Sequence, residues 1–205
     1  MAFQWVLDER KYLTTCEVRR LTRAARALSR SDGADGVRAW LLVDLVSESG
    51  LRVGEVAGLC VGDVMVHDGR RSILVRRGKG GKSRVVRIGR SLASHLCRFL
   101  SWKARRGEPV ESGSALLWSS RVQGAYSRRA LQLMFKRCAR SAGLPGYVSV
   151  HCLRHTYAVH LYKASGYNLR LVQKQLGHSS VRTTEVYADV FDADLVRAVD
   201  CLYGK

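Results

Sequence analysis

The sequence predicts an α+β fold that is mainly α-helical, with a small antiparallel three-stranded sheet near residues 63–89. Apolar residues recur at helical spacing near the N-terminus and again through the second half of the chain. Between these regions the pattern changes to short β-rich runs separated by glycine-containing turns. A chain of 205 residues is long enough for one ordinary core, so we expect a single domain over residues 1–205.

The first helix is expected to begin close to the start of the chain. Thr14 and Glu17 have the spacing of a capping box, and apolar residues then follow at helical intervals. Residues 31–36 are polar and contain glycine and aspartate, which predicts a turn. A second helix is expected over residues 37–48, with Gly50 at its end.

The remaining elements follow from the same patterns. Three short runs rich in β-branched residues make up the expected sheet: 64–66, 73–75 and 85–88. Three segments beyond it have helical spacing: 92–100, 130–138 and 153–161. Ser127 is expected to cap the middle one of these helices.

The chain carries a large excess of positive charge. Lysine and arginine number 35 against 17 acidic residues, for a net charge of +18. Such a field favours polyanions and makes their binding salt-dependent, so nucleic acid is the expected partner. Charge alone leaves two alternatives open: a basic protein that neutralises another molecule, such as a ribosomal component, or a basic face for an acidic membrane.

The sequence carries no recognisable signal for a membrane or for secretion. No apolar stretch approaches the roughly 20 residues that a bilayer requires, and the N-terminus does not resemble a secretory signal. We therefore expect a soluble, cytoplasmic protein with no membrane partner. The six cysteines form no CxxC pair and are expected to be reduced core residues: Cys16, Cys60, Cys97, Cys138, Cys152 and Cys201.

Two arginines have neighbours that suit phosphate binding. His151 and Arg154 lie three residues apart and so share a helix face, where a guanidinium can donate paired hydrogen bonds and an imidazole can exchange a proton. Arg52 is followed three residues later by Glu55, whose carboxylate could orient the guanidinium. Taken singly, the first pair also fits an ordinary basic helix surface and the second an intrahelical ion pair.

The turn between the second and third expected strands is strongly basic. Its lysines and neighbouring arginines could enter a DNA groove from the tip of a hairpin: Arg76, Arg77, Lys79, Lys82 and Arg84. The simplest alternative is a solvated loop that touches phosphates. The segment lacks the spacing of a nucleotide-binding P-loop, which disfavours nucleotide hydrolysis.

His178 and Tyr187 lie near each other towards the end of the chain, and alone either could be a core residue. With the earlier segments they complete an ordered pattern of Gly-Leu-Arg-x-x-Glu, Gly-Lys-Gly, His-x-Leu-Arg-His, and Leu-Gly-His followed by a tyrosine. This pattern resembles the helical catalytic domain of the tyrosine recombinases, the phage integrase family, over about residues 12–189. The joint spacing is specific, because unrelated chains rarely reproduce so many positioned roles.

The resemblance implies a role for each residue. The catalytic set would be two phosphate-clamping arginines, a hairpin lysine, two histidines and a tyrosine nucleophile: Arg52, Arg154, Lys79, His151, His178 and Tyr187. His151 is the candidate acceptor of the tyrosyl proton, and Lys79 the candidate general acid for the leaving 5′-oxygen, with Lys82 as the alternative. The 3′-phosphotyrosyl link conserves the phosphodiester energy, so no metal or other cofactor is expected.

The resemblance also implies an assembly on double-stranded DNA, encoded by a bacterium, an archaeon, a phage or another mobile element. We expect a homo-oligomer, a tetramer on two synapsed duplexes, with a monomer as the alternative in the absence of DNA. A C-terminal helix is expected within residues 190–205, and its apolar face over residues 192–203 would suit docking on a neighbouring protomer.

Most family members carry an N-terminal domain that clamps the DNA from the other side, and we expect this domain to be absent. The chain would then be either a naturally short recombinase or a fragment of a longer protein. Two other functions stay open, a type IB topoisomerase that relaxes supercoils and a catalytically idle DNA-binding regulator. The short spacing from Leu-Gly-His to the tyrosine favours the recombinase, and the intact residue set argues against an idle regulator.

Overall fold

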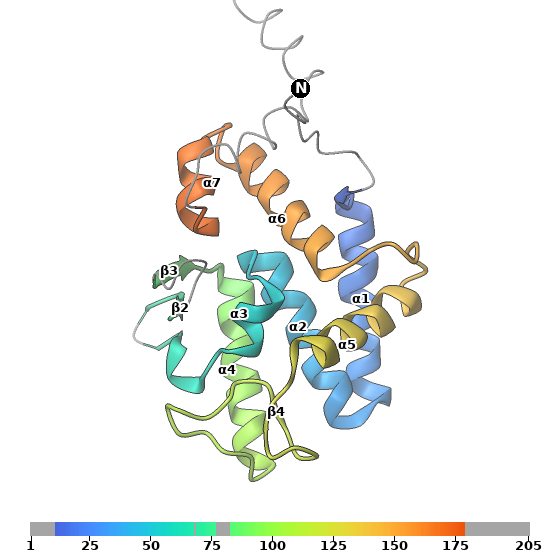
Figure 1. Ribbon diagram of the computed structural model, residues 1–205, viewed down its shortest axis with the longest axis vertical. Helices are drawn as coiled ribbons and strands as arrows, with labels where there is room; N and C mark the ends of the chain where they lie inside the picture. The colour runs from blue at the N-terminus through green and yellow to red at the C-terminus, as the bar shows by residue number, and fades with distance from the viewer. Residues whose placement is uncertain (1–10, 68, 77–82, 179–205) are drawn as a thin grey trace, which may run out of the picture.

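The computed structural model describes residues 11–67, 69–76 and 83–178, and it places a small sheet beside a group of helices (Figure 1). The described helices are, in chain order, α1 (Thr15–Ser31), α2 (Gly33–Ser49), α3 (Val53–Ala57), the short 3-10 helix η2 (Val61–Asp63), α4 (Arg90–Arg105), α5 (Arg128–Ser141), α6 (Val150–Ala164) and α7 (Leu169–Leu176). The strands are β1 (Val64–Met65), β2 (Ser72–Val75), β3 (Arg84–Arg87), β4 (Trp118–Ser119) and β5 (Gly124–Ala125). The predicted mainly helical α+β fold with an antiparallel three-stranded sheet is confirmed. None of the helices among these residues is long and apolar enough to cross a membrane.

Helix α1 begins where its capping box predicts. The Thr14 hydroxyl accepts a hydrogen bond from the Glu17 backbone N–H at 3.3 Å, and the Glu17 carboxylate accepts one from the Thr14 N–H at 2.8 Å. Two donors at the helix start are thereby satisfied by local sequence alone. Leu21 and Ala25, one turn apart on the same face, have no exposed surface. The predicted first helix is confirmed.

The turn predicted over residues 31–36 is wrong. Helix α1 ends at Ser31 and α2 begins at Gly33, so a single residue joins them. Gly33 has a φ of +56°, a backbone conformation that reverses the chain and that glycine adopts without strain. Gly36 lies inside α2, where an added Cβ would stand 2.1 Å from the carbonyl oxygen of Leu28. These glycines allow close packing of the two helices instead of forming a longer loop.

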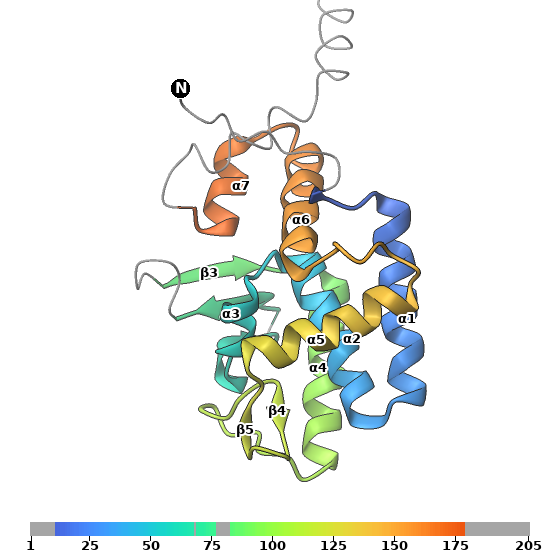
Figure 2. The ribbon, with the colours of Figure 1, turned by 45° about the vertical axis from the view of Figure 1, so that its right-hand side comes forward.

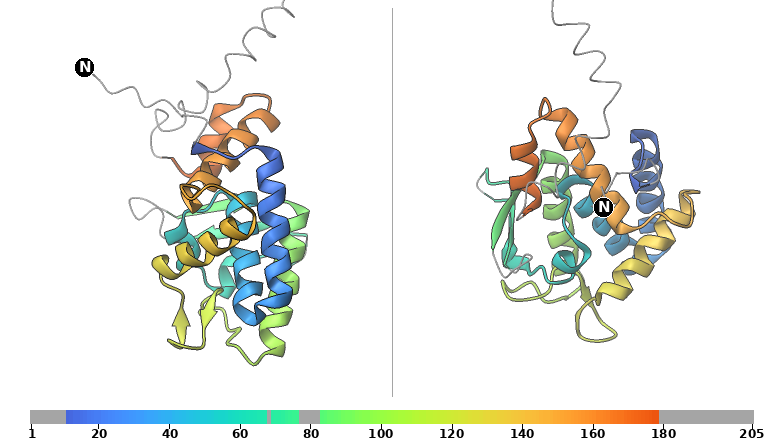
Figure 3. Two further views of the ribbon diagram at one scale, coloured as in Figure 1. Left: turned by 90° about the vertical axis from the view of Figure 1, so that its right-hand side faces the viewer. Right: turned by 45° about the horizontal axis from the view of Figure 1, so that its top comes forward.

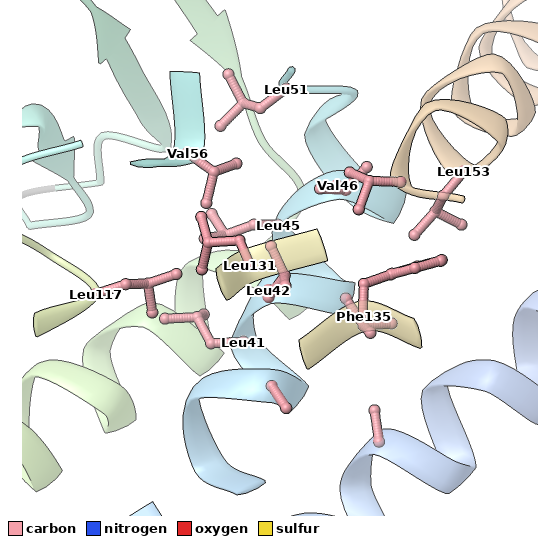
Figure 4. Close-up of a cluster of buried hydrophobic side chains, with 14 of the residues drawn as sticks. Leu41, Leu42, Leu45, Val46, Leu51, Val56, Leu117, Leu131, Phe135 and Leu153 are labelled. Carbon is pink, nitrogen blue, oxygen red and sulfur yellow. The ribbon is translucent and has the colours of Figure 1, made fainter. Parts of the chain in front are cut away.

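Helix α2 runs through the middle of the core (Figure 4). Its side chains Leu42, Leu45 and Val46 have no exposed surface and lie among Leu131 and Phe135 of α5. Buried side chains from other elements complete this cluster: Leu51, Val56, Leu117 and Leu153. Each fully buried side chain of this kind contributes roughly 1.5–3 kcal/mol of transfer free energy. The core therefore fixes α3, α5 and α6 around α2.

The three-stranded sheet is antiparallel in the order β1-β2-β3. Ile73 in the central strand pairs with Val64 on one side and Val86 on the other, and all three side chains are buried. The sheet lies beside α3, on the side of the molecule away from α1 (Figure 2). Helix α7 is joined to β3, because the side-chain amide of Gln175 donates to the Arg87 carbonyl at 2.6 Å.

The β4–β5 hairpin lies at the end of the molecule away from α6 and α7 (Figure 3). The connection from α4 towards this hairpin is held by buried charges. Glu108 accepts a hydrogen bond from Arg38 of α2, and its carboxylate lies 3.6 Å from the Nζ of Lys103, a side chain with no exposed surface. Burial lowers the pKa of Lys103, while the charge of Glu108 acts in the opposite direction. Ion pairs thus fix a connection that carries few apolar residues.

The prediction that the cysteines are core residues is wrong for most of them. Only Cys138 among the described cysteines is buried, whereas Cys16 is exposed and Cys60, Cys97 and Cys152 are half-buried. All five are free thiols, and Cys201 lies outside the described residues. Burial raises the pKa of Cys138 to about 11, which makes this thiol a packing group at neutral pH.

Candidate active site

A cavity of about 670 Å³ opens between the start of α3, one face of α5 and the start of α6. Arg52, His151 and Arg154 line it, as the sequence predicted for members of one site, together with Glu55. Helix α5 adds polar side chains to the same cavity: Arg128, Arg129, Gln132 and Lys136. The contributing segments are far apart in the chain and meet because α3, α5 and α6 all pack on α2 (Figure 2).

Arg52 stands directly before α3, where the backbone is extended with φ −71° and ψ 148°. Glu55, three residues on in α3, turns back towards it. One carboxylate oxygen accepts from the Arg52 backbone N–H at 2.8 Å, and the other accepts from the guanidinium Nη1 at 3.0 Å. Glu55 therefore orients the Arg52 side chain. The side chain is still 31% exposed, so it reaches the cavity surface. This contact matches the orienting pair expected from the sequence.

Arg154 lies in the first turns of α6 and is only 3% exposed. Its Nη1 donates to the carbonyl oxygen of Gly50, at the end of α2, and its Nη2 donates to the carbonyl oxygen of Leu176 at 3.0 Å. The same guanidinium lies 3.9 Å from the carboxylate of Glu55. Main-chain acceptors from two other helices therefore hold this arginine in one position within the folded chain.

His178 follows α7 and contacts Arg154, with 3.2 Å between its Nε2 and the Nη2 of the guanidinium. A guanidinium can only donate, so the Nε2 of His178 is the acceptor and the proton of the neutral ring is assigned to Nδ1. Burial, together with the charges of Arg154 and Arg52, lowers the pKa of His178 to about 3. At neutral pH His178 is therefore an uncharged group beside a buried cation.

His151 lies at the start of α6, and its ring meets the ring of His155 edge-on with 4.2 Å between centroids. Burial, followed by the charges of Arg154 and Arg52, lowers the pKa of His151. Burial, followed by the charge of His151, lowers the pKa of His155 to about 4. Both rings are therefore neutral at pH 7, and a neutral imidazole can accept a proton.

Glu55 is shared between two segments. Besides Arg52, it binds Arg84 of β3 through two hydrogen bonds of 2.7 and 2.9 Å, one to each carboxylate oxygen. Burial alone would raise the pKa of Glu55, but the hydrogen bonds from Arg84 and from the Arg52 backbone, with the charges of Arg84 and Arg154, lower it to about 2. The carboxylate is thus ionised at any physiological pH.

Two glycines beside the site have left-handed backbones that the packing requires. Gly50 ends α2 with a φ of +64°, and an added Cβ would stand 2.3 Å from the ring of Tyr157. Gly177 ends α7 with a φ of +66°, and an added Cβ would stand 2.5 Å from the side chain of Arg84. Glycine avoids both the backbone strain and the contact, which accounts for the glycines of the Gly-Leu-Arg and Leu-Gly-His segments.

The structure brings part of the predicted site together. Arg52, Glu55, His151 and Arg154 line one cavity, and His178 contacts Arg154. Two residues predicted to contact DNA have protein partners: the 58% exposed Arg76 binds Asp63, whereas Arg84 is 13% exposed and binds Glu55. The other predicted residues and the expected C-terminal helix lie outside the described part of the chain: Arg77, Lys79, Lys82, Tyr187 and 190–205. Their roles stay predictions.

Sequence reasoning gave no role to the basic face of α5 or to His155. The basic residues of α5 alternate with a buried face that includes Leu131 and Phe135, which is the pattern of any amphipathic helix on a core. The sequence signal available was the pair of adjacent arginines, Arg128 and Arg129, directly after the helix cap. Within residues 11–178, excluding the gaps noted above, no group of three or more His, Cys, Asp or Glu side chains is arranged to hold a metal ion.

The helical fold is that of a tyrosine recombinase catalytic domain. A sequence profile of the phage integrase family matches residues 11–194, so the chain belongs to this family. The tyrosine recombinase XerD of Mycobacterium leprae is 37% identical over 181 residues, which cover 86% of this chain and 56% of that protein. The tyrosine recombinase XerC of Actinobacillus pleuropneumoniae is 34% identical, covering 86% of this chain and 55% of that protein.

Solved structures agree with this assignment. The crystal structure of the XerA recombinase has a TM-score of 0.73 and 28% identity, covering 92% of this chain and 64% of that one. The XerH site-specific recombinase bound to its difH substrate, in a pre-cleavage complex, has a TM-score of 0.75 and 27% identity, covering 93% and 54%. This chain spans about half the length of the curated relatives it matches.

Proposed function

We propose that this chain cuts and rejoins DNA strands as a site-specific recombinase, through a covalent link between Tyr187 and a 3′-phosphate. The observation that carries the proposal is the convergence of Arg52, His151 and Arg154 on one cavity, with His178 3.2 Å from Arg154. These residues come from separate segments, and their types match what a phosphate under attack requires. Family membership and the curated relatives, which are recombinases, support the same activity.

Electrostatic stabilisation is the main contribution that we assign to the arginines. Attack on a backbone phosphate builds negative charge on the nonbridging oxygens, and donors already in position lower the barrier most. Glu55 orients Arg52, and the carbonyl oxygens of Gly50 and Leu176 hold Arg154. In this proposal the clamp is set by folding, so it needs little rearrangement when the phosphate arrives.

Proton transfer is assigned to His151 and to a lysine of the hairpin. His151 is neutral at pH 7, because burial and two neighbouring arginines lower its pKa, and it would accept the proton of Tyr187. Once protonated, His151 would also donate a hydrogen bond to the phosphate, because it lines the same cavity as Arg52 and Arg154. Lys79 would protonate the leaving 5′-oxygen, with Lys82 as the alternative, as proposed for the hairpin from the sequence.

Double-stranded DNA is the proposed partner, held by the basic residues that surround the cavity. Arg128 and Arg129 at the start of α5, with Lys136 two turns on, offer cations on the same side as Arg52. A net charge of +18 supports binding through backbone phosphates, which would weaken steeply with salt. Arg76 and Arg77 would extend this basic surface at the hairpin.

Assembly and location are part of the same proposal. We assign residues 1–205 to one catalytic domain that works as a homo-oligomer, a tetramer on synapsed DNA, with residues 190–205 docking on a neighbouring protomer. Strand exchange needs at least two active sites on two duplexes, which motivates the oligomer. A DNA substrate also favours the cytoplasm, where bacterial DNA lies; the curated relatives are bacterial.

The test is covalent capture. The protein is incubated with suicide DNA substrates, each nicked next to a candidate cleavage site so that the cut fragment diffuses away and rejoining is blocked. Denaturing electrophoresis should show an adduct in wild type and none in Tyr187→Phe. Tyr167→Phe, which removes the hydroxyl of a 46% exposed tyrosine, is the matched control and should form the adduct normally. Absence of the adduct across substrates, or its survival in Tyr187→Phe, would contradict the proposal.

A second readout separates the alternative functions. A recombinase should transfer the captured strand to the 5′-hydroxyl of a second duplex that carries the same site. A type IB topoisomerase would instead relax supercoiled plasmid without a preferred sequence, and an idle regulator would bind DNA without forming an adduct.

A further inference from the structure

We propose that Arg84 is a positioning residue of this active site, which holds Glu55 so that the carboxylate keeps Arg52 and Arg154 in place, and that it does not contact DNA. This inference rests on the proposed function. It changes the assignment made from the sequence, where Arg84 was grouped with the DNA-binding residues of the hairpin.

Arg84 and Glu55 form a bidentate ion pair. Nη1 donates to one carboxylate oxygen at 2.7 Å and Nη2 to the other at 2.9 Å. Paired bonds of this kind fix the plane of the carboxylate as well as its distance, which a lysine could not do. The two partners come from β3 and α3, so the contact joins the strand after the hairpin to the helix after Arg52.

Burial argues against a phosphate contact by the same side chain. Arg84 is 13% exposed and Glu55 is 5% exposed, whereas the neighbouring Arg87 on the same strand is exposed. A guanidinium that left Glu55 for a DNA phosphate would leave a buried carboxylate with weaker neutralisation. Breaking a buried ion pair by removing one partner is strongly destabilising, because the remaining buried charge loses its compensation.

The position of Arg84 also depends on the Leu-Gly-His segment. An added Cβ at Gly177 would stand 2.5 Å from the Arg84 Cδ and 2.7 Å from its Nε, so the backbone of this segment packs directly on the side chain. Arg84 is therefore enclosed between Glu55 on one side and Gly177 on the other. One residue later His178 contacts Arg154, and Arg154 lies 3.9 Å from Glu55. Arg84 thus lies where three of the four motif segments meet.

The experiment compares two variants from one strand in the suicide-substrate assay. Arg84→Gln removes the contact to Glu55, and Arg87→Gln removes one exposed positive charge while leaving its backbone bonds to Gln175 intact. We expect Arg84→Gln to lower the cleavage rate at saturating DNA by about 10- to 100-fold. The Kd for DNA should change no more than in Arg87→Gln. Arg84→Lys keeps the charge and disturbs the fold less, and it should stay well below the wild-type rate, because lysine cannot make the paired bonds.

Two further readouts separate positioning through Glu55 from a general loss of structure. Loss of the Arg84 bonds raises the pKa of Glu55, so the acid side of the rate–pH profile should move to higher pH in Arg84→Gln and stay in place in Arg87→Gln. The double variant Glu55→Gln/Arg84→Gln should cleave at about the rate of Glu55→Gln alone, because both changes remove one interaction.

The outcomes are distinct. If Arg84→Gln weakens DNA binding and lowers its salt dependence more than Arg87→Gln, with an unchanged rate at saturating DNA, Arg84 is a phosphate contact and the inference is overturned. The inference is also overturned if the decreases in cleavage rate caused by Glu55→Gln and by Arg84→Gln multiply in the double variant. If wild type itself forms no adduct, the proposed function fails and the inference fails with it; an active wild type with an equally active Arg84→Gln refutes the inference alone.

Discussion

Substitution of Gly50 by alanine should destabilise the fold far more than the size of one methyl group suggests. The φ of Gly50 is +64°, a conformation that costs an alanine roughly 1–2 kcal/mol. The new Cβ would also lie 2.3 Å from the Cδ1 of Tyr157 and 2.9 Å from the Cδ2 of Leu176. Overpacking of a buried site adds about 1–3 kcal/mol, so the free energy of unfolding should fall by about 2–5 kcal/mol.

Gly143→Ala is the matched control for this prediction. Its φ is +63°, nearly that of Gly50, but nothing lies within 4 Å of the added Cβ. Urea denaturation of both variants therefore separates the backbone cost, common to both, from the steric cost, present only at Gly50. A difference between the two variants of less than about 0.5 kcal/mol would refute the reasoning, since the packing against Tyr157 would then carry no energetic weight.

Three further predictions concern pH and salt. Glu55 has a pKa of about 2 in the fold against 4.5 as its ordinary value, so the stability it contributes, up to about 3 kcal/mol, is fully present above pH 4.5 and is lost as the pH falls towards 2. Glu55→Gln should lose less stability than wild type between pH 4.5 and pH 3 in urea titrations; parallel curves would contradict this. His155 has a folded pKa of about 4 against 6.5, so the unfolded chain binds its proton more readily and stability should decline as the pH falls through that window, less so in His155→Gln. An equal loss of stability in wild type and His155→Gln over this pH range would argue against this role of His155. Arg129→Gln, at the cavity, should reduce the slope of log Kd for DNA against log salt by about one, whereas Arg140→Gln, at the far end of α5, should leave the slope nearly unchanged. Equal slopes in the two variants would remove α5 from the proposed DNA surface.

Much of the fold followed from local patterns because the forces involved are local. The capping box of Thr14 and Glu17 acts within one turn, and the short β-rich run 73–75 predicts a strand without knowledge of its partners. The missed start of α2 has a non-local cause. Gly36 suggested a turn, yet the position requires glycine because the backbone of Leu28 passes beside it and leaves no room for a Cβ. A single sequence does not distinguish a glycine needed for flexibility from one needed for space.

The candidate site shows the same difference between local contacts, which the sequence predicted, and long-range contacts, which it did not. The pairing of Arg52 with Glu55 was expected because the two are three residues apart. The pairing of Glu55 with Arg84 was missed because the partners are 29 residues apart and a basic hairpin suggests exposed cations. The buried contact of Arg38 with Glu108, across 70 residues, left no local sign at all. Which charges are neutralised inside the protein is decided by tertiary packing, so charge counts alone overstate the cations left for DNA.

The acceptors that hold Arg154 have a consequence for how this site can vary. The oxygens of Gly50 and Leu176 belong to the main chain, and every amino acid at those positions carries the same oxygen. Substitution of either residue cannot delete the acceptor and can only move it. Sequence change around the arginine is therefore constrained by backbone shape: Gly50 is required for its left-handed conformation and not for its oxygen, and insertions or deletions near residues 50 and 176 should be poorly tolerated because they displace the acceptors.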